Sequence, residues 1–291
     1  MIDLQLHSNF SDGSMSPTEL VQEAKQLELS AIALTDHDTT EGISEFLEAG
    51  QKLNILTVPG VEISIDTKLP NHGHMHMLGL FIDHQHNELV SKLNYLRFHR
   101  NERAQKILSK LHELGAEVSL SELQQEAGEG SIGRPHIAKI MLRKGIVSTL
   151  QEAFDRYLAK GQPAYVDKIK FNEEDAINLI KQAGGLAILA HPHLMKYPTF
   201  NETAEKILFL KSLNLDGIEV YYSGLDLGYS RQLIQLAKEH NLAVSGGSDY
   251  HGKNKAGIHM GSGQNDLAIP DEVYFNLKHK WEKLRTLAGI E

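Results

Sequence analysis

Histidine and carboxylate residues recur in short clusters along most of the chain. The protein has 16 histidines among 291 residues, and histidine is the commonest metal ligand as well as a general acid or base near neutral pH. The sequence contains no cysteine, which excludes disulfides and thiolate metal sites. Any metal must therefore be held by nitrogen and oxygen atoms, a ligand set that suits zinc, manganese or iron.

These clusters fall at or near the ends of predicted strands. They comprise His7 and Asp12, Asp36-His37-Asp38, Glu62, His191-Pro192-His193, Glu219 and Asp249-Tyr250-His251. Each group alone has an ordinary explanation, since acidic residues cap helices and isolated histidines are mostly surface residues. In parallel α/β folds, however, functional groups collect at the carboxyl ends of strands. Because burying so many polar groups unpaired is costly, the coincidence predicts two or three metals that share a bridging carboxylate.

A further run of histidines lies in the segment His72-Gly73-His74-Met75-His76. The three imidazoles share one face of an extended strand, because side chains alternate with period two. A single metal seldom needs all three. His76 is the preferred ligand because it lies deepest in the predicted strand.

Alternating strands and helices carry the polar clusters. Strands are predicted over residues 2–6, 31–34, 55–58, 61–64, 75–82, 186–190, 217–221 and 242–245. Helices are predicted over residues 17–27, 42–53, 173–183, 203–213, 226–239 and 272–288, the first with Ser16, Pro17 and Glu19 as a capping box. Repeated strand–helix units indicate a largely parallel sheet, open or closed into a barrel.

Four helical stretches interrupt this alternation in the middle of the chain, over residues 89–114, 121–127, 135–143 and 150–158. The predicted organisation is therefore a barrel formed by residues 1–88 and 164–291, with a helical insertion at residues 89–163. No internal repeat or long linker separates the parts.

The bulk composition is that of a globular protein, with 41% hydrophobic and 23% charged residues. The net charge of −9 argues against a broad nucleic-acid-binding surface, although bound cations could make one pocket locally positive for a nucleotide. No apolar run approaches the roughly 18 residues of a membrane span, and the N-terminus lacks signal-peptide features. A cytoplasmic location is expected, whereas the oligomeric state is not predicted.

Taken together, the motifs resemble those of the PHP (polymerase and histidinol phosphatase) family. The resemblance is greatest to its bacterial branch of nucleoside 3′,5′-bisphosphate phosphatases and 5′-to-3′ exoribonucleases. The matching pieces are Asp3-Leu4-Gln5-Leu6-His7-Ser8, Ser11-Asp12-Gly13, Thr35-Asp36-His37-Asp38-Thr39, Gly60-Val61-Glu62, His76-Met77-Leu78-Gly79, Arg134-Pro135-His136-Ile137-Ala138, Ala190-His191-Pro192, Gly217-Ile218-Glu219-Val220 and Gly247-Ser248-Asp249-Tyr250-His251. This resemblance implies a distorted (β/α)₇ barrel whose mouth is covered by the helical insertion.

The resemblance also implies a ligand set for two or three divalent ions such as Mn, Zn or Fe. One metal would take His7, Glu62 and Asp249, a second Glu62, His76 and His191, and a third Asp12, His37 and His251, with Glu62 as the bridge. The sequence departs from the family at Gln5, where the family usually has histidine. A glutamine oxygen binds hard cations but is a weaker ligand for zinc-like metals, so this site could be weakened, selective for a harder ion or empty.

The function implied is hydrolysis of nucleotide phosphomonoesters, most of all nucleoside 3′,5′-bisphosphates, and of the 5′ ends of short RNA. A hydroxide that bridges two metals would attack the phosphorus. Asp36 and His193 are the candidate acids for the leaving oxygen. Arg134 is the predicted phosphate clamp because a guanidinium binds two phosphate oxygens at once, with His136 and Lys168 assisting.

Three alternatives stay open from the sequence. The first is a phosphatase for another small metabolite such as histidinol phosphate. The second is a barrel hydrolase of the amidohydrolase kind, although those usually begin with His-x-His and often add a carbamylated lysine. The third is a metal-binding module without catalysis, because Gln5 breaks the first motif.

Overall fold

Seven strands form one sheet in which each strand hydrogen-bonds to the next along the chain. They are β1 (Ile2–Leu6), β2 (Ala31–Leu34), β3 (Leu56–Ser64), β4 (His76–Leu80), β5 (Leu186–Leu189), β6 (Gly217–Tyr222) and β7 (Ala243–Gly247). After β7 the chain returns to β1: the amide of Asp249 donates to the carbonyl of Gln5 at 3.1 Å, and Leu6 bridges Tyr250. This computed structural model describes residues 1–127, 132–287 and 289, and confirms the predicted α/β barrel, nearly closed.

One strand departs from the parallel arrangement. β4 runs antiparallel to both β3 and β5, and it follows β3 without an intervening α-helix, through the short turn η1 (Pro70–His72). His76 at the start of β4 therefore pairs with Ser64 at the end of β3. The reversal explains why a histidine at the beginning of a strand reaches the same rim as residues at the ends of the parallel strands.

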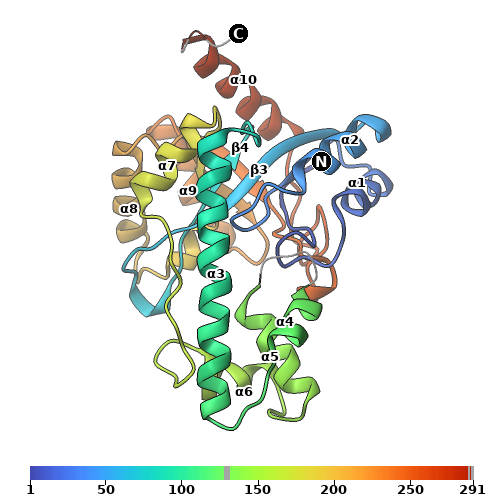
Figure 1. Cartoon of the computed structure of the whole chain (residues 1–291). Helices are drawn as coiled ribbons and strands as arrows, with labels where there is room; N and C mark the ends of the chain where they lie inside the picture. Colours follow the sequence, from blue (N-terminus) through green and yellow to red (C-terminus); the bar gives the residue numbers. More distant parts are fainter. Residues whose placement is uncertain (128–131, 288, 290–291) are drawn as a thin grey trace.

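Helices surround the barrel on its outside (Figure 1). They are α1 (Pro17–Gln26), α2 (Ile43–Leu53), α7 (Glu173–Gln182), α8 (Phe200–Ser212), α9 (Leu227–Glu239) and α10 (Asp271–Leu287), with short turns η3 (Pro192–Met195) and η4 (Gly252–Asn254). The predicted capping box is confirmed at α1, where Ser16 and Glu19 exchange hydrogen bonds of 3.2 and 2.7 Å. Residue 288, with which the last predicted helix ends, lies outside the described residues.

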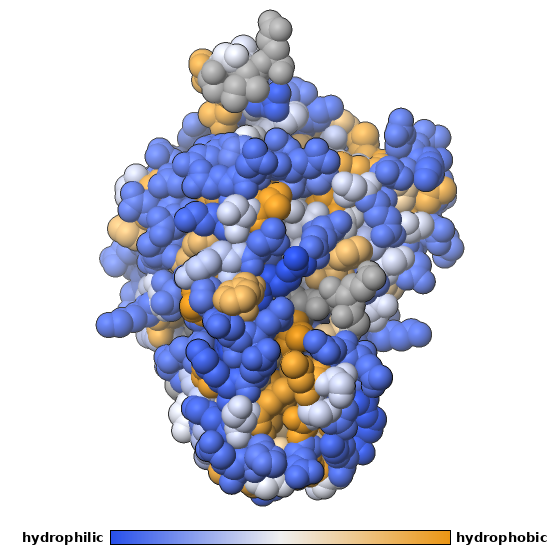
Figure 2. Space-filling model, in the orientation of Figure 1, coloured by the Kyte–Doolittle hydropathy of each residue, from blue (hydrophilic) through white to orange (hydrophobic). Residues whose placement is uncertain are grey.

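The central helices form a lobe that extends below the barrel, with the long helix α3 (Asn87–Glu113) running from beside the barrel to the far end of the lobe (Figure 1). This helical lobe consists of α3, α4 (Leu120–Ala127), α5 (Arg134–Arg143), α6 (Leu150–Ala153) and η2 (Phe154–Leu158). Its own apolar core includes Ile107, Leu111 and Met141, whereas Leu89 and Leu93 at the start of α3 belong to a core shared with the barrel. Figure 2 shows apolar side chains between α3 and α5 on a face that is otherwise largely polar.

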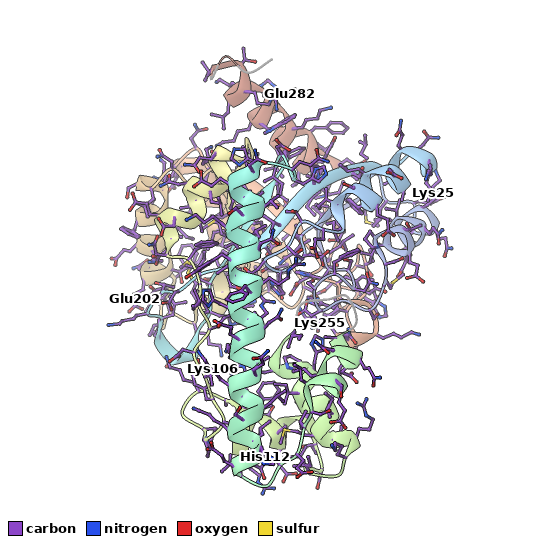
Figure 3. All side chains as sticks on the ribbon, in the orientation of Figure 1. Lys25, Lys106, His112, Glu202, Lys255 and Glu282 are labelled. Carbon is purple, nitrogen blue, oxygen red and sulfur yellow. The ribbon has the colours of Figure 1, made fainter. Side chains whose placement is uncertain are left out.

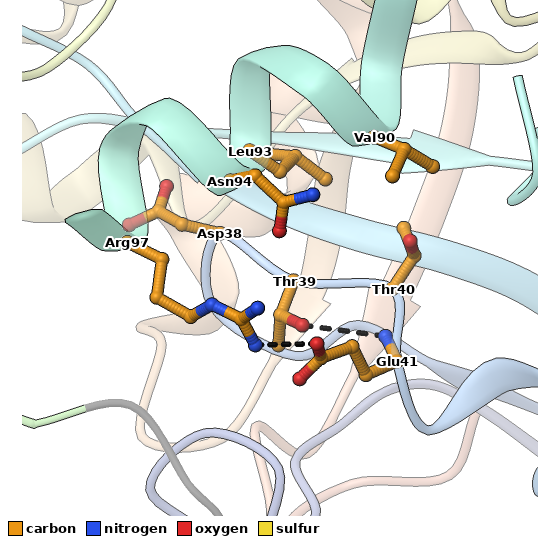
Figure 4. Close-up of a pocket in the computed structure, with 8 residues that line it drawn as sticks. All are labelled: Asp38, Thr39, Thr40, Glu41, Val90, Leu93, Asn94 and Arg97. Atoms are coloured by element: carbon orange, nitrogen blue, oxygen red, sulfur yellow. Dashed lines mark hydrogen bonds and ion pairs between the residues drawn. The ribbon is translucent and has the colours of Figure 1, made fainter. Parts of the chain in front are cut away.

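Two arginines of α3 attach the lobe to the loop after β2. Arg100 forms an ion pair with buried Asp38, and one turn earlier Arg97 forms an exposed ion pair with Glu41. Figure 4 shows this second contact beside a small cavity of about 100 Å³. The long helix is thus fixed to the barrel by one buried and one exposed ion pair.

Among the described residues, no helix has the length and apolar character to cross a membrane.

Candidate active site

Glu62, on β3, lies at the centre of four imidazoles at the barrel mouth. Its Oε1 is 2.7 Å from His76 Nδ1 and 3.0 Å from His191 Nε2. Its Oε2 is 3.1 Å from His7 Nε2 and 3.4 Å from His37 Nδ1. Burial by itself raises the pKa of Glu62, but the surrounding imidazoles hold it well below its usual value. The carboxylate is therefore ionised and contacts four side chains that come from four different strand ends.

Three groups of candidate ligands share this centre. Their members are His7, Asp12, His37 and His251; His37, Glu62 and His76; and His7, Glu62 and Asp249. The last group matches a predicted triad, and the first is another predicted triad with His7 added. In the second, His37 lies beside Glu62 and His76, while His191 approaches Glu62 from the other side. The structure thus brings all eight histidine and carboxylate ligands predicted from the sequence together, and their assignment to individual metals stays a prediction.

A tight loop after β1 places His7 and Asp12. Asp36 fixes this loop from behind, where it accepts the Ser8 amide at 2.7 Å and the hydroxyls of Ser8 and Ser11 at 2.5 Å each. A Cβ at Gly13 would lie 2.1 Å from the carbonyl oxygen of His7, so the close approach requires glycine. Asp36 is buried, and its three bonds favour a positioning role over the proton transfer predicted from the sequence.

The candidate ligands His191 and Asp249, and the neighbouring Asp38, have left-handed backbone conformations. The φ angles are 54° at Asp38, 29° at His191 and 56° at Asp249. Such conformations are uncommon outside glycine and collect at functional sites, where surrounding structure holds them. The Asp38 side chain supplies part of that support, since its Oδ1 accepts the Ser64 amide at 3.0 Å.

Buried donor atoms without partners test whether this cluster fits divalent metal ions. Among the described residues, both ring nitrogens of His7, Nδ1 of His37 and Oε2 of Glu62 are buried and form no hydrogen bond of good geometry, although Glu62 Oε2 lies 3.1 Å from His7 Nε2 and 3.4 Å from His37 Nδ1. Burial lowers the pKa of His37 to about 4, which keeps its ring in the neutral form that binds metals. Since orphaned polar atoms are costly in a protein interior, this donor set fits metal ions.

Gln5 lies beside the cluster with a different partner. Its amide nitrogen donates to both oxygens of Glu219 on β6, at 2.8 and 3.2 Å, an orientation that follows from the hydrogen-bond network. Glu219 also accepts the His191 amide at 2.8 Å. Burial and nearby carboxylates raise the pKa of Glu219 well above its usual value. The geometry favours Gln5 as a partner of Glu219 rather than as the metal ligand predicted from the sequence.

The sequence reasoning missed two residues that hold the outer oxygen of Asp249. Oδ1 of Asp249 faces His7 at 3.1 Å, whereas Oδ2 accepts from the Tyr222 hydroxyl at 2.9 Å and from Lys255 Nζ at 2.5 Å. Figure 3 places Lys255 where the barrel meets the helical lobe. No sequence motif marks Lys255 as a partner of Asp249. The two are six residues apart, and the turn η4 between them brings the chain back to the site.

His193, the other predicted acid, packs against the ring of Tyr222 and is not among the candidate metal ligands. The two ring centroids are 4.9 Å apart, and burial lowers the pKa of His193 to about 4. His193 is therefore neutral at physiological pH. This geometry gives its predicted role as a proton donor no support.

Two neighbouring cavities open beside the cluster. The metal cavity, about 510 Å³, is lined by Asp12, His37, Glu62, His74, His76, His136, Lys139, His191, Tyr222, Asp249, His251 and Lys255. The cation cavity, about 930 Å³, is lined by Asp66, Lys68, Arg103, Arg134, Phe154, Lys160, Tyr165, Asp167, Lys168 and Lys170. They adjoin, because Gly73 and Arg134 line the cation cavity while the next residues, His74 and Pro135, line the metal cavity.

The predicted substrate-binding residues divide between these cavities. His136 faces the metal cavity, whereas Arg134 and Lys168 face the cation cavity. The Arg134 guanidinium donates to the carbonyl of Leu158 at 2.8 Å and lies 5.4 Å from the ring centroid of Tyr165. These contacts fix its plane and leave other N–H groups for a ligand.

Lys168 is anchored at the wall between barrel and lobe. Its Nζ is 2.7 Å from both Asp38 Oδ2 and the Ser64 hydroxyl. Burial lowers the pKa of Lys168 to about 8, although Asp38 acts in the opposite direction. Asp38 therefore positions Lys168 and, through Arg100, the start of the helical lobe.

Comparisons with known proteins agree with this geometry. The family model of the PHP domain matches residues 3–167. A 5′-3′ exoribonuclease from Haemophilus influenzae is 36% identical over 86% of this chain and 89% of its own length. A 3′,5′-nucleoside bisphosphate phosphatase from Chromobacterium violaceum is 32% identical over 89% of this chain and 90% of its own length. A crystal structure from Bifidobacterium adolescentis, described as a metal-dependent phosphoesterase, is 27% identical, with a TM-score of 0.81 over 95% of this chain and 94% of that one.

An α/β barrel with imidazoles and carboxylates at its mouth is the architecture of a metal-dependent hydrolase. The family match extends over more than half of the chain, and the relatives cover most of it. This chain belongs to the PHP family, and the family predicted from the motifs is confirmed.

Proposed function

We propose that this protein is a metal-dependent phosphoesterase that removes a phosphate from nucleoside 3′,5′-bisphosphates. Its class follows from the family and from relatives named as phosphatase, exoribonuclease and phosphoesterase. The identity of the substrate is the more specific part of the proposal. It is supported by two adjoining cavities, one lined by candidate metal ligands and the other by basic side chains.

A nucleotide with two phosphates on one ribose matches this layout. One phosphate would enter the metal cavity, where His136, Lys139 and Lys255 add basic side chains to the candidate ligands. The other would meet Arg134 and Lys168 in the cation cavity. Guanidinium groups bind two phosphate oxygens at once, and charge-assisted hydrogen bonds of this kind are about twice as strong as neutral ones. The second phosphate then orients the first for reaction.

The residues that would hold divalent cations are His7, Asp12, His37, Glu62, His76, His191, Asp249 and His251. Bound cations would supply a nucleophilic water at neutral pH and neutralise the phosphoryl oxygens. The protein contributes orientation: Asp36 holds the loop of His7 and Asp12, and Tyr222 with Lys255 fixes Asp249. Lys255 also brings a positive charge to the cavity that receives the scissile phosphate. The lobe contributes Pro135, His136 and Lys139 to the wall of the metal cavity.

The experiment compares three substrates with the manganese-loaded protein. Phosphate release should be fastest from adenosine 3′,5′-bisphosphate, and slower from adenosine 3′-phosphate and from histidinol phosphate. A 5′-phosphorylated short RNA tests the activity for which the Haemophilus influenzae relative is named. Glu48→Gln, on an exposed face of α2, is the control variant.

Two outcomes would overturn the proposal. One is turnover that survives complete removal of metal, and the other is a preference for histidinol phosphate over every nucleotide. A count of bound metal ions distinguishes the proposed enzyme from the non-catalytic alternative, because a degenerate site would hold less than one ion per chain. The native metal is tested in the same series by loading Mn, Zn and Fe in turn.

A further inference from the structure

The cation cavity contains more positive charge than one phosphate requires. Six basic and two acidic side chains line it, and one of the basic ones, Lys168, is already paired with Asp38. A phosphomonoester carries between about −1.5 and −2 charges at pH 7. Arg134 and Lys168 are the groups that meet this phosphate in the function proposed above. Lys68, Arg103, Lys160 and Lys170 also line the cavity and are left for further negative charge on the ligand.

Four of these cations, Arg103, Arg134, Lys160 and Lys170, line one cavity and act on one another electrostatically. Burial lowers the pKa of Arg103 to about 10, and repulsion from Arg134 contributes, whereas Asp167 acts in the opposite direction. Burial also lowers the pKa of Lys170, and repulsion from Arg134 and Lys160 acts in the same direction, whereas Asp66 and Asp38 raise it. Lys160 is the exposed member of the four.

Nearby carboxylates compensate only part of this charge, since six basic and two acidic side chains line the cavity. Within the described part of the chain, none of the four forms an ion pair with a carboxylate. The Nε of Arg103 donates to the carbonyl of Val166 at 2.7 Å, and Nζ of Lys170 to that of Ile65 at 3.2 Å. Main-chain carbonyls orient these groups without neutralising them. A partly buried cavity in which cations outnumber carboxylates indicates an anionic ligand that carries more charge than one phosphate.

The size of the cavity agrees with that ligand. Its volume of about 930 Å³ is in the range that encloses a whole drug-sized molecule, far more than a single phosphoryl group. Phe154 and Tyr165 line the cavity beside Arg134, with ring centroids 5.9 and 5.4 Å from its guanidinium carbon. Lys160 and Lys170 line the same cavity and supply charge for a second phosphoryl group.

We propose that the cation cavity binds a diphosphate, so that the enzyme hydrolyses the monophosphate of nucleotides that carry a diphosphate on the other ribose hydroxyl. The proposal rests on the function proposed above. Water adds its oxygen to the phosphorus of the monophosphate, the bond from phosphorus to the ribose oxygen breaks, and that oxygen takes a proton. Adenosine 3′-phosphate 5′-diphosphate and water thus give ADP and inorganic phosphate.

The test measures kcat/KM of the manganese-loaded full chain for adenosine 3′-phosphate 5′-diphosphate and for adenosine 3′,5′-bisphosphate. Free manganese is held constant, because the diphosphate itself binds the ion. We expect the diphosphate to be the better substrate by at least threefold. ³¹P NMR should show ADP and phosphate as products, with the diphosphate intact.

Substitutions at Lys160 separate the contribution of the second phosphoryl group from that of the first. Lys160→Ala should lower kcat/KM for the diphosphate substrate about tenfold, and for the bisphosphate less than threefold. Lys160→Arg should restore the preference. Lys52→Ala, an exposed lysine of α2 that pairs with Glu48, should change neither value.

Three outcomes would contradict these expectations, and they are distinguishable. No phosphate release from adenosine 3′,5′-bisphosphate overturns the proposed function and this inference with it. Turnover of the bisphosphate with a slower diphosphate substrate overturns the inference alone. So does an equal loss on both substrates in Lys160→Ala, because the lysine would then act on the shared part of the substrate.

Discussion

The metal cavity and the cation cavity are neighbours, yet they are constructed from different parts of the fold. The polar groups at the centre of the metal cavity come from the rim of the barrel, and they are deeply buried: the His7 side chain is 0% exposed and that of Glu62 1%. Those of the cation cavity come from the helical lobe and the segments beside it, and apart from buried Arg103 they are more open, with Lys168 22% exposed and Lys160 at the surface.

This difference indicates how the two tasks are divided. Side chains on strand ends are held at fixed positions, which suits the fixed spacing that metal ligands require. Side chains on an inserted lobe and its loops vary without disturbing the barrel, which suits recognition of the substrate. The comparison predicts that substitutions in the metal cavity abolish the reaction, whereas those in the cation cavity change which substrate is preferred.

The largest effect is expected at Glu62. Glu62→Gln keeps the shape of the side chain but removes the charge that faces four histidines. We expect kcat to fall by roughly 10³-fold or more on every substrate, together with a lower metal content, because charge stabilisation by metals is worth several kcal/mol. Steady-state kinetics and elemental analysis measure both. Substrate-dependent losses with full metal occupancy would break the comparison.

Arg134 should show a smaller and selective effect. Arg134→Ala removes a partly buried guanidinium from the cation cavity, and a charge-assisted hydrogen bond is worth about 1.5–3 kcal/mol. We expect kcat/KM for adenosine 3′,5′-bisphosphate to fall roughly 10- to 150-fold, mainly through KM. Adenosine 3′-phosphate, which lacks the second phosphate, should change less than threefold. Equal losses on both substrates, in protein with an unchanged melting temperature, would contradict the division of tasks.

The pH dependence sharpens the comparison further. The pKa of Lys168 is lowered from its ordinary 10.5 to about 8, mainly by burial, so its positive charge is lost between about pH 7 and 9. Because the charged form attracts phosphate, KM for the bisphosphate should rise above pH 8, by up to about tenfold per unit. Lys168→Arg keeps its charge and should flatten the rise. An unchanged profile in this variant would assign the titration to another group.

The barrel rim could largely be predicted from the sequence, because its signals are local. A buried strand followed at once by Asp36-His37-Asp38 carries both the element and the ligand in a few residues. The direction of β4 could not be predicted, since strand pairing is a tertiary property, and only that reversal places the start of β4 beside the end of β3. The alternation of strands and helices by itself predicts that β4 runs parallel to its neighbours.

The second cavity was harder to foresee. Arg134 was predicted as a phosphate ligand, but its separation from His136 arises from α5, which directs neighbouring residues into different cavities. Arg103 reaches the same cavity from the middle of α3, with no local motif. Lys255 and Gln5 depend on side-chain contacts with Asp249 and Glu219, and no sequence periodicity encodes these contacts.

The smallest effect is expected where the lobe meets the barrel. The Arg97–Glu41 ion pair shown in Figure 4 has side chains 41% and 44% exposed, whereas the Arg100–Asp38 pair is 10% and 2% exposed. Exposed pairs contribute about 0.2–1 kcal/mol, and salt screens them. A double-mutant cycle with Arg97→Ala and Glu41→Ala, followed by urea unfolding, should give a coupling free energy in that range that decreases at high salt. Turnover of the bisphosphate should stay within twofold.

This cycle also decides what holds the lobe against the barrel. If the buried Arg100–Asp38 pair holds the lobe to the barrel, loss of the exposed pair leaves Arg134 and Lys168 in place, because Asp38 contacts both Arg100 and Lys168. A coupling free energy above about 2 kcal/mol, or a tenfold loss of kcat/KM, would exceed what exposed pairs supply. The lobe would then depend on a surface contact, and recognition could not vary independently of the barrel.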